Sequence, residues 1–118
     1  MAMILIADDA AFMRMKCAAL IKELGHDVIE AADGAEAVSL YKQQRPDAVL
    51  LDITMPKMNG MEALRAILEY DRDARIAMVT AMGQQQVIMD AIRTGAKDFV
   101  VKPFDSGRIQ AALWKLVG

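Results

Sequence analysis

The stretch VLLDITMPKMNG, residues 49–60, carries an apolar run directly into an aspartate and then into a turn. The run Val49-Leu50-Leu51 is typical of a buried strand. A carboxylate at the end of such a strand loses hydration unless a cation or a hydrogen-bond donor compensates it. Pro56 and the pair Asn59-Gly60 favour a turn beyond it. Asp52 is therefore either a simple turn residue or a carboxylate with a chemical function.

Similar apolar runs occur along the whole chain, and apolar residues at helical spacing follow each one. The runs predict strands at residues 3–7, 27–31, 48–51, 75–79 and 98–101. The helical stripes are Met13, Cys17, Leu20, Leu24; Ala37, Leu40, Tyr41; Leu64, Ile67, Leu68; Val87, Ile88, Ala91, Ile92; and Ile109, Ala112, Leu113, Leu116. Gly25 and Gly95 stand where helix C-termini are expected. The alternation predicts an α/β fold, a doubly wound (βα)5 unit whose five parallel strands take the flavodoxin-like order 2-1-3-4-5.

Length and composition restrict the class of protein. The chain has 118 residues, 55% of them hydrophobic and 25% charged, which fits one folded domain over residues 1–118. The net charge of −2 gives no reason to expect nucleic-acid binding. One cysteine allows no internal disulfide, and the N-terminal apolar run is too short to span a membrane. We therefore expect a cytoplasmic protein with no nucleic-acid or membrane partner.

Polar residues follow four of the five expected strands. Asp8 and Asp9 follow the first, Asp52 the third, Thr80 the fourth and Lys102 the fifth. Ligands of open parallel sheets bind at the carboxyl ends of the strands, beside the point where the strand order reverses. In the predicted order, that point lies between the first and third strands. The three aspartates should therefore lie together there.

The chemistry of this set indicates phosphoryl transfer. Clustered carboxylates raise one another's pKa unless a cation lies among them, and oxygen ligands suit Mg²⁺. The ammonium of Lys102 and the hydroxyl of Thr80 can bind phosphoryl oxygens. An aspartate can act as the nucleophile. Asp52 stands alone at the end of a central strand, so we expect it to be the nucleophile rather than Asp8 or Asp9.

Taken one at a time, these residues also fit simpler roles. Asp8 or Asp9 could cap the first helix, and Thr80 and Lys102 could be ordinary strand-end residues. An aspartyl-phosphate phosphatase would need a second carboxylate two residues after Asp52, where the chain has threonine. A flavin-binding domain would need a Ser/Thr/Gly-rich loop after the first strand, where the chain has DDAAF. The phosphatase and the flavin-binding domain are therefore disfavoured.

Four stretches carry a family resemblance: ILIADDAAFMR, LLDITMPKMNGMEAL, MVTAMG and GAKDFVVKPF. Together they span the chain in order, and the chain resembles bacterial two-component response-regulator receiver domains, in particular the stand-alone chemotaxis type. The resemblance implies a signalling switch rather than an enzyme. It also implies a histidine kinase of the chemotaxis type as phosphodonor, and a protein monomeric before phosphorylation. A receiver portion of a longer regulator, with a transcriptional or enzymatic output, remains the alternative.

The resemblance also implies roles for single residues. Asp52 matches the phosphoacceptor, and Asp8, Asp9, Asp52 and the backbone carbonyl of Thr54 match the ligands of Mg²⁺, for which Mn²⁺ can substitute in vitro. Lys102, preceding a typically cis proline, matches the lysine that pairs with the phosphoryl group. Thr80 and Phe99 match the switch residues. Thr54 and Met82 match two positions that, in similar proteins, tune phosphate lifetime. The downstream target is expected on the face formed by the fourth helix, the fifth strand and the fifth helix.

A few residues outside this set invite a prediction. His26, in a GHD turn without a second metal ligand nearby, is expected to be exposed and inert. Cys17 is expected to be a buried small hydrophobe. Trp114, Met82 and Met89 are expected to be partly exposed.

Overall fold

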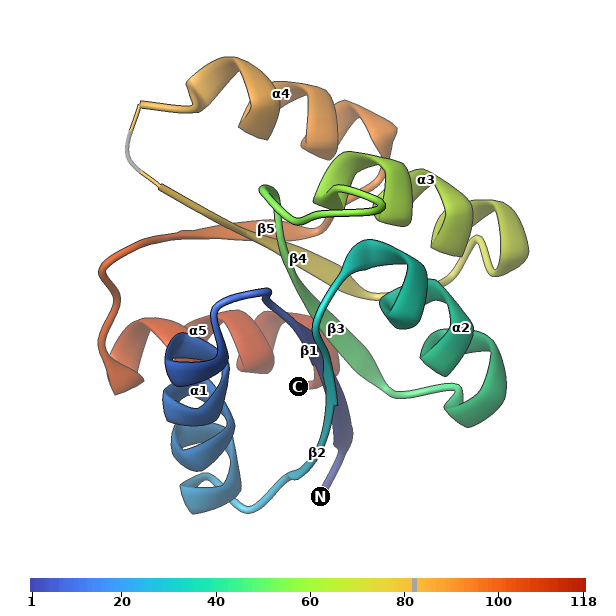
Figure 1. Ribbon diagram of the computed structural model, residues 1–118. Helices are drawn as coiled ribbons and strands as arrows, with labels where there is room; N and C mark the ends of the chain where they lie inside the picture. Colours follow the sequence, from blue (N-terminus) through green and yellow to red (C-terminus); the bar gives the residue numbers. More distant parts are fainter. Residues whose placement is uncertain (82) are drawn as a thin grey trace.

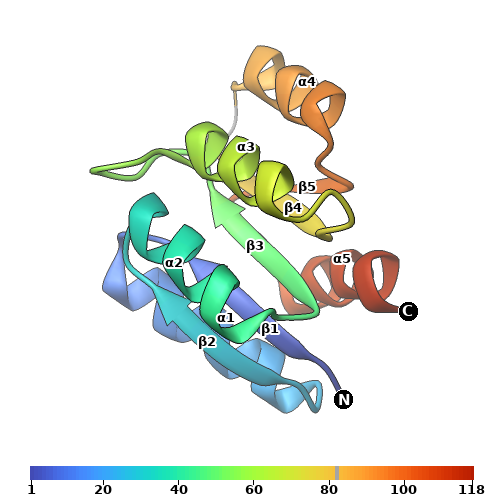
Figure 2. The same ribbon diagram turned by 90° about the vertical axis from the view of Figure 1, so that its right-hand side faces the viewer.

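Strands and helices alternate from one end of the chain to the other. The protein is described by a computed structural model that covers residues 1–81 and 83–118. The elements in chain order are β1 (Met3–Ala7), α1 (Ala11–Glu23), β2 (Asp27–Ala31), α2 (Gly34–Gln44), β3 (Ala48–Asp52), α3 (Gly60–Tyr70), β4 (Ile76–Thr80), α4 (Gln85–Thr94), β5 (Asp98–Val101) and α5 (Ser106–Val117). Figures 1 and 2 show a central sheet with helices on both faces.

The sheet is parallel and has the strand order β2-β1-β3-β4-β5, as the sequence predicted. Side chains alternate along each strand, so β1, β3 and β4 each contribute buried residues to two cores. One core includes Leu5 and Leu51 and lies under α2, α3 and α4. The other includes Ile4 and Leu50 and lies under α1 and α5. The sheet is thus covered on both faces, which explains its near-continuous apolar strands.

Two strand boundaries differ from the prediction. The third strand extends one residue further, to Asp52, and the fourth is Ile76–Thr80 rather than 75–79. The cause is pairing with the neighbouring strands, since Asp52 is in register with Val79, and Thr80 with Val101. Asp52 and Thr80 are therefore the last residues of their strands, and the backbone of both is fixed by the sheet.

The helix ends partly follow the predicted signals. Gly25 and Gly95 adopt positive φ at the ends of α1 and α4, as expected. Neither Asp8 nor Asp9 caps α1, because the N-cap is Ala10 and no side chain caps that helix. The carboxylate of Asp8 instead accepts a hydrogen bond from the backbone N–H of Ala10 at 2.9 Å. Asp8 thus stays at the strand edge rather than in the helix.

The predicted apolar stripes are buried to different degrees. The α5 stripe is fully buried. In α1 the buried residues are Cys17, Ala18 and Ile21, because the helix is rotated so that Met13, Leu20 and Leu24 flank the contact. In α4 only Ala91 is buried, and Ile92 is 43% exposed. Among the described residues, no helix has the length and hydropathy needed to cross a membrane.

Candidate functional site

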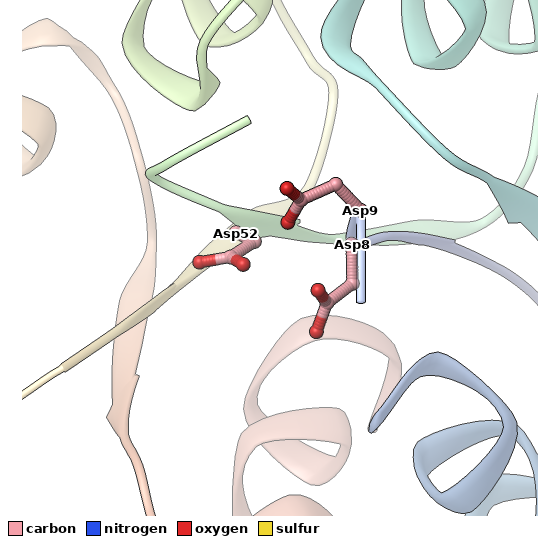
Figure 3. Close-up of side chains that lie close together, drawn as sticks. All are labelled: Asp8, Asp9 and Asp52. Carbon is pink, nitrogen blue, oxygen red and sulfur yellow. The ribbon is translucent and has the colours of Figure 1, made fainter. Parts of the chain in front are cut away.

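Three carboxylates meet where β1 and β3 end. Asp8 and Asp9 follow β1, and Asp52 is the last residue of β3. One carboxylate oxygen from each lies within 4.8 Å of the other two. Figure 3 shows the three side chains at the ends of these neighbouring strands. The sequence predicted this cluster, and the strand order explains it, because β1 and β3 are adjacent at the switch point.

The ammonium of Lys102 connects two of these carboxylates. Its Nζ lies 3.2 Å from Asp52 Oδ2 and 3.3 Å from Asp8 Oδ2. Lys102 follows β5, and its backbone N–H donates to the Thr80 carbonyl at 2.7 Å, which ties it to the end of β4. The Lys102-Pro103 peptide bond is cis, as the family resemblance implied. The lysine therefore reaches from β5 across to β3 and β1.

Burial and charge set the protonation of this group. Burial raises the pKa of Asp52, the attraction of Lys102 opposes this, and the charge of Asp8 adds to it. Burial lowers the pKa of Lys102, but the carboxylates of Asp52 and Asp8 together outweigh that effect, so the pKa of the ammonium is raised. Lys102 thus stays charged at neutral pH, and the ionised form of Asp52 is less favourable in this site than it would be in water.

The donor set fits a divalent metal ion. The three carboxylates offer hard oxygen ligands, which Mg²⁺ prefers. A single ammonium offsets only part of three negative charges, so a cation among the carboxylates would relieve the remaining repulsion. Thr54 lies in the loop directly after β3 and is exposed. Its carbonyl as a further ligand remains a prediction.

The loop between β3 and α3 is held by close backbone contacts. The N–H of Gly34, the first residue of α2, donates to the Met58 carbonyl at 2.9 Å, and that of Gly60 donates to Ile53 at 2.8 Å. A Cβ on Gly34 would lie 2.0 Å from the Met58 oxygen, and one on Gly60 would lie 2.2 Å from the Asp52 oxygen. Both glycines therefore position the loop that leaves Asp52. Sequence reasoning recognised the Asn59-Gly60 turn but not these contacts.

The predicted switch residues are on β4 and β5, the two strands that follow β3 in the sheet. Thr80 is fully buried, and its Oγ1 lies 2.6 Å from Gln84 Oε1 and 3.1 Å from the Ala81 carbonyl oxygen. Phe99, on β5, is 37% exposed. Gln84 was not singled out from the sequence, because a polar residue before a helix gives no signal of a contact with a buried hydroxyl. Met82, predicted to influence phosphate lifetime and to be partly exposed, lies outside the described residues.

The other residues singled out from the sequence mostly behave as predicted. Cys17 is buried, and Trp114 and Met89 are exposed. The prediction that His26 is exposed is wrong, because the residue is half-buried and its Nδ1 accepts a hydrogen bond from the Ala2 backbone N–H at 3.0 Å. This contact joins the start of the chain to the α1–β2 turn, which a local sequence pattern does not reveal.

The class of protein is thus an α/β domain with a flavodoxin-like parallel sheet, in which an acidic cluster and a lysine lie together at the switch point. The chain belongs to the response regulator receiver domain family, and the match to the family model spans residues 4–114.

Two relatives and one solved structure illustrate the likeness. The chain is 50% identical over 114 residues to the chemotaxis protein CheY of Thermotoga maritima. The matched region covers 96% of this chain and 95% of that protein. It is 47% identical over 119 residues to protein CcdB of Bacillus subtilis, covering 100% and 99%. A structure of a CheX-CheY-BeF3-Mg²⁺ complex from Borrelia burgdorferi superposes with a TM-score of 0.93 at 39% identity, covering 98% of this chain and 89% of that chain.

Proposed function

We propose that this response-regulator switch accepts a phosphoryl group on Asp52 from a histidine kinase in the presence of Mg²⁺ (or Mn²⁺ in vitro). The family and its CheY members support a phosphorylation-activated switch. The observation that carries the finer assignment is the bridge from Lys102 to Asp52 and Asp8, at 3.2 and 3.3 Å. It leaves a positive charge beside Asp52, where the oxygens of an incoming phosphoryl group would be.

The residues of the site divide the chemistry among them. A carboxylate oxygen of Asp52 attacks phosphorus, the new O–P bond forms, and the N–P bond of the phosphohistidine breaks with its electron pair going to the imidazole. Asp8, Asp9, Asp52 and the Thr54 carbonyl would hold the metal ion, which supplies charge neutralisation at the phosphoryl oxygens. Lys102 pairs with one phosphoryl oxygen, and the hydroxyl of Thr80 donates a hydrogen bond to another. The chain thereby assists its own modification without being an enzyme for another substrate.

The proposed output surface is the face of α4, β5 and α5. Met89 and Ile92 on α4 and Phe99 on β5 are 49%, 43% and 37% exposed. A largely apolar hollow of about 570 Å³ lies between α4 and β5, with Phe99 and Val101 in its wall. Phosphorylation would draw Thr80 toward Asp52, let Phe99 turn inward and reshape this face. A downstream protein would then bind there by apolar contacts.

The cellular role we propose is chemotaxis signalling in the cytoplasm, with a histidine kinase of the CheA type and an unphosphorylated monomer. The CheY relative at 50% identity supports this role. The alternative is a receiver unit, over residues 1–118, belonging to a longer regulator with a different output. Binding of the phosphorylated protein to a flagellar-motor component, compared with DNA or an enzyme substrate, would separate the two.

The decisive test is intact mass after incubation with acetyl phosphate, with and without Mg²⁺. We expect wild type to gain one phosphoryl group only with Mg²⁺, and Asp52→Asn to gain none. Asp73→Asn, which changes an exposed aspartate in the loop between α3 and β4, is the matched control and should behave as wild type. A wild type that gains nothing, or an Asp52→Asn variant that gains as much as wild type, would refute the proposal.

A further inference from the structure

The hydroxyl of Thr80 has a partner that no part of the proposed chemistry uses. Gln84 Oε1 lies 2.6 Å from Thr80 Oγ1, and the Ala81 carbonyl oxygen lies 3.1 Å away. Thr80 is fully buried, so an unpaired hydroxyl there would be costly. A hydroxyl carries one proton. While that proton is donated to Gln84 or Ala81, it is not available at Asp52.

The side chain of Gln84 bonds to Thr80 in place of the cap hydrogen bond that an N-cap residue often makes. Gln84 is the N-cap residue of α4, yet its side chain makes no cap hydrogen bond. Its backbone carbonyl accepts from the Ile88 N–H at 3.1 Å, so the backbone belongs to the first turn of the helix. The side chain turns back to the end of β4 instead. Gln84 therefore ties the start of α4 to the buried hydroxyl of Thr80.

The same residue also borders the proposed output surface. Gln84 lines the hollow between α4 and β5 together with Phe99 and Val101. Any movement of the Thr80 hydroxyl toward Asp52 removes the hydrogen bond that fixes the Gln84 side chain in this wall. One side chain thus contacts both the switch hydroxyl and the surface that the switch is proposed to change.

We propose that Gln84 is a positioning residue that holds the Thr80 hydroxyl away from Asp52 and so opposes activation. This inference rests on the proposed function. Phosphorylation then exchanges one hydrogen bond of Thr80 for another, and the strength of the Gln84 bond reduces the net gain. Removing the acceptor from position 84 should therefore make the active arrangement easier to reach.

The test compares Gln84→Met, which keeps the length of the side chain but removes the acceptor, with Gln85→Met. Gln85 is the exposed first residue of α4 and provides a matched change at the neighbouring position. The first measurement is the χ1 rotamer of Thr80 by three-bond NMR couplings, in protein without metal or phosphoryl donor. The second is the affinity for beryllium fluoride in the presence of Mg²⁺.

We expect a single Thr80 rotamer in wild type and Gln85→Met, and averaged couplings in Gln84→Met. We expect Gln84→Met to bind beryllium fluoride roughly three- to tenfold more tightly, the factor that one ordinary buried hydrogen bond contributes. The Ala81 carbonyl can still accept the proton, which places the effect toward the lower end. General damage to the site would weaken binding, so a gain of affinity distinguishes positioning from a purely structural role.

Two results would overturn the inference: Thr80 couplings in Gln84→Met that match wild type, or an affinity no tighter than that of Gln85→Met. If wild type binds no beryllium fluoride at all, the proposed function fails. The Gln84 contact is then judged by the Thr80 couplings alone, because they are measured without any ligand.

Discussion

Replacing Gly34 by alanine tests whether a close backbone contact holds the loop beside the acidic cluster. Gly34 begins α2 and does not have positive φ, so its backbone conformation suits alanine. The obstacle is space, because the new Cβ would lie 2.0 Å from the Met58 carbonyl oxygen and 2.7 Å from its carbonyl carbon. Both atoms are backbone, so relief requires α2 and the loop to move apart.

The expected cost follows from three contributions. Overpacking against backbone falls at the upper end of the usual range of about 1–3 kcal/mol. Separation also weakens the Gly34 N–H···O hydrogen bond to Met58, which is 2.9 Å long and contributes about 1 kcal/mol. Alanine in a helix gains at most about 1 kcal/mol over glycine. The free energy of unfolding should therefore fall by about 2 to 3 kcal/mol, a large part of the roughly 5–15 kcal/mol typical of a domain.

Urea unfolding at 25 °C of wild type, Gly34→Ala and Gly107→Ala is the assay. Gly107 lies in the first turn of α5, and a Cβ there would meet only the Asp105 carboxylate, at 3.3 Å. Gly107→Ala should be unchanged or up to about 1 kcal/mol more stable. A Gly34→Ala protein as stable as wild type would refute the reasoning, because it would mean that the loop does not press on α2.

Two further predictions concern titratable side chains. Burial in the folded protein raises the pKa of Asp52 above its ordinary value of 3.8. The resulting contribution to stability is fully present below pH 3.8 and is lost as pH rises through the raised pKa. In EDTA, the stability of Asp52→Asn relative to wild type should therefore increase as pH rises from about 4 through the raised pKa of Asp52. A stability difference that shrinks with pH in urea unfolding would contradict this. Burial raises the pKa of Cys17 to about 11, so only about one thiol in a thousand is ionised at pH 8 and reaction with a thiol reagent should be far slower than in urea-unfolded protein; equal rates in the two states would contradict it.

The fold could be predicted because its pattern is local. Each strand is a short apolar run and each helix repeats apolar residues at helical spacing, so periodicity alone separates them. The meeting of Asp8, Asp9 and Asp52 could also be predicted, because strand order and polar strand ends determine which residues share an edge. Their chemical roles remain predictions.

Contacts between distant side chains could not be predicted in the same way. The hydrogen bond from Ala2 to His26 and the approach of Gly34 to Met58 depend on how loops pack after the sheet has formed. The strand end at Asp52 was missed by one residue because pairing with β4, not the apolar pattern, decides where β3 stops. The rotation of α1 was missed for a similar reason, since packing on the sheet selects the buried face.

Both the lysine and the threonine of the proposed switch have polar partners before any phosphoryl group is present. Lys102 pairs with Asp52 and Asp8, and Thr80 donates to Gln84 or Ala81. Among the described residues, every buried polar side-chain atom has a hydrogen-bond partner. In the proposed switch, activation would therefore exchange bonds rather than form them from unpaired groups, and the bonds lost would offset part of the free energy of the bonds gained. The phosphoryl group would then shift the population only by the net gain, because a ligand moves an equilibrium only by its differential stabilisation of one state. On this reasoning, the proposed effect of Gln84 on that equilibrium needs no contact with the phosphoryl group, because Gln84 acts on the bond that Thr80 gives up.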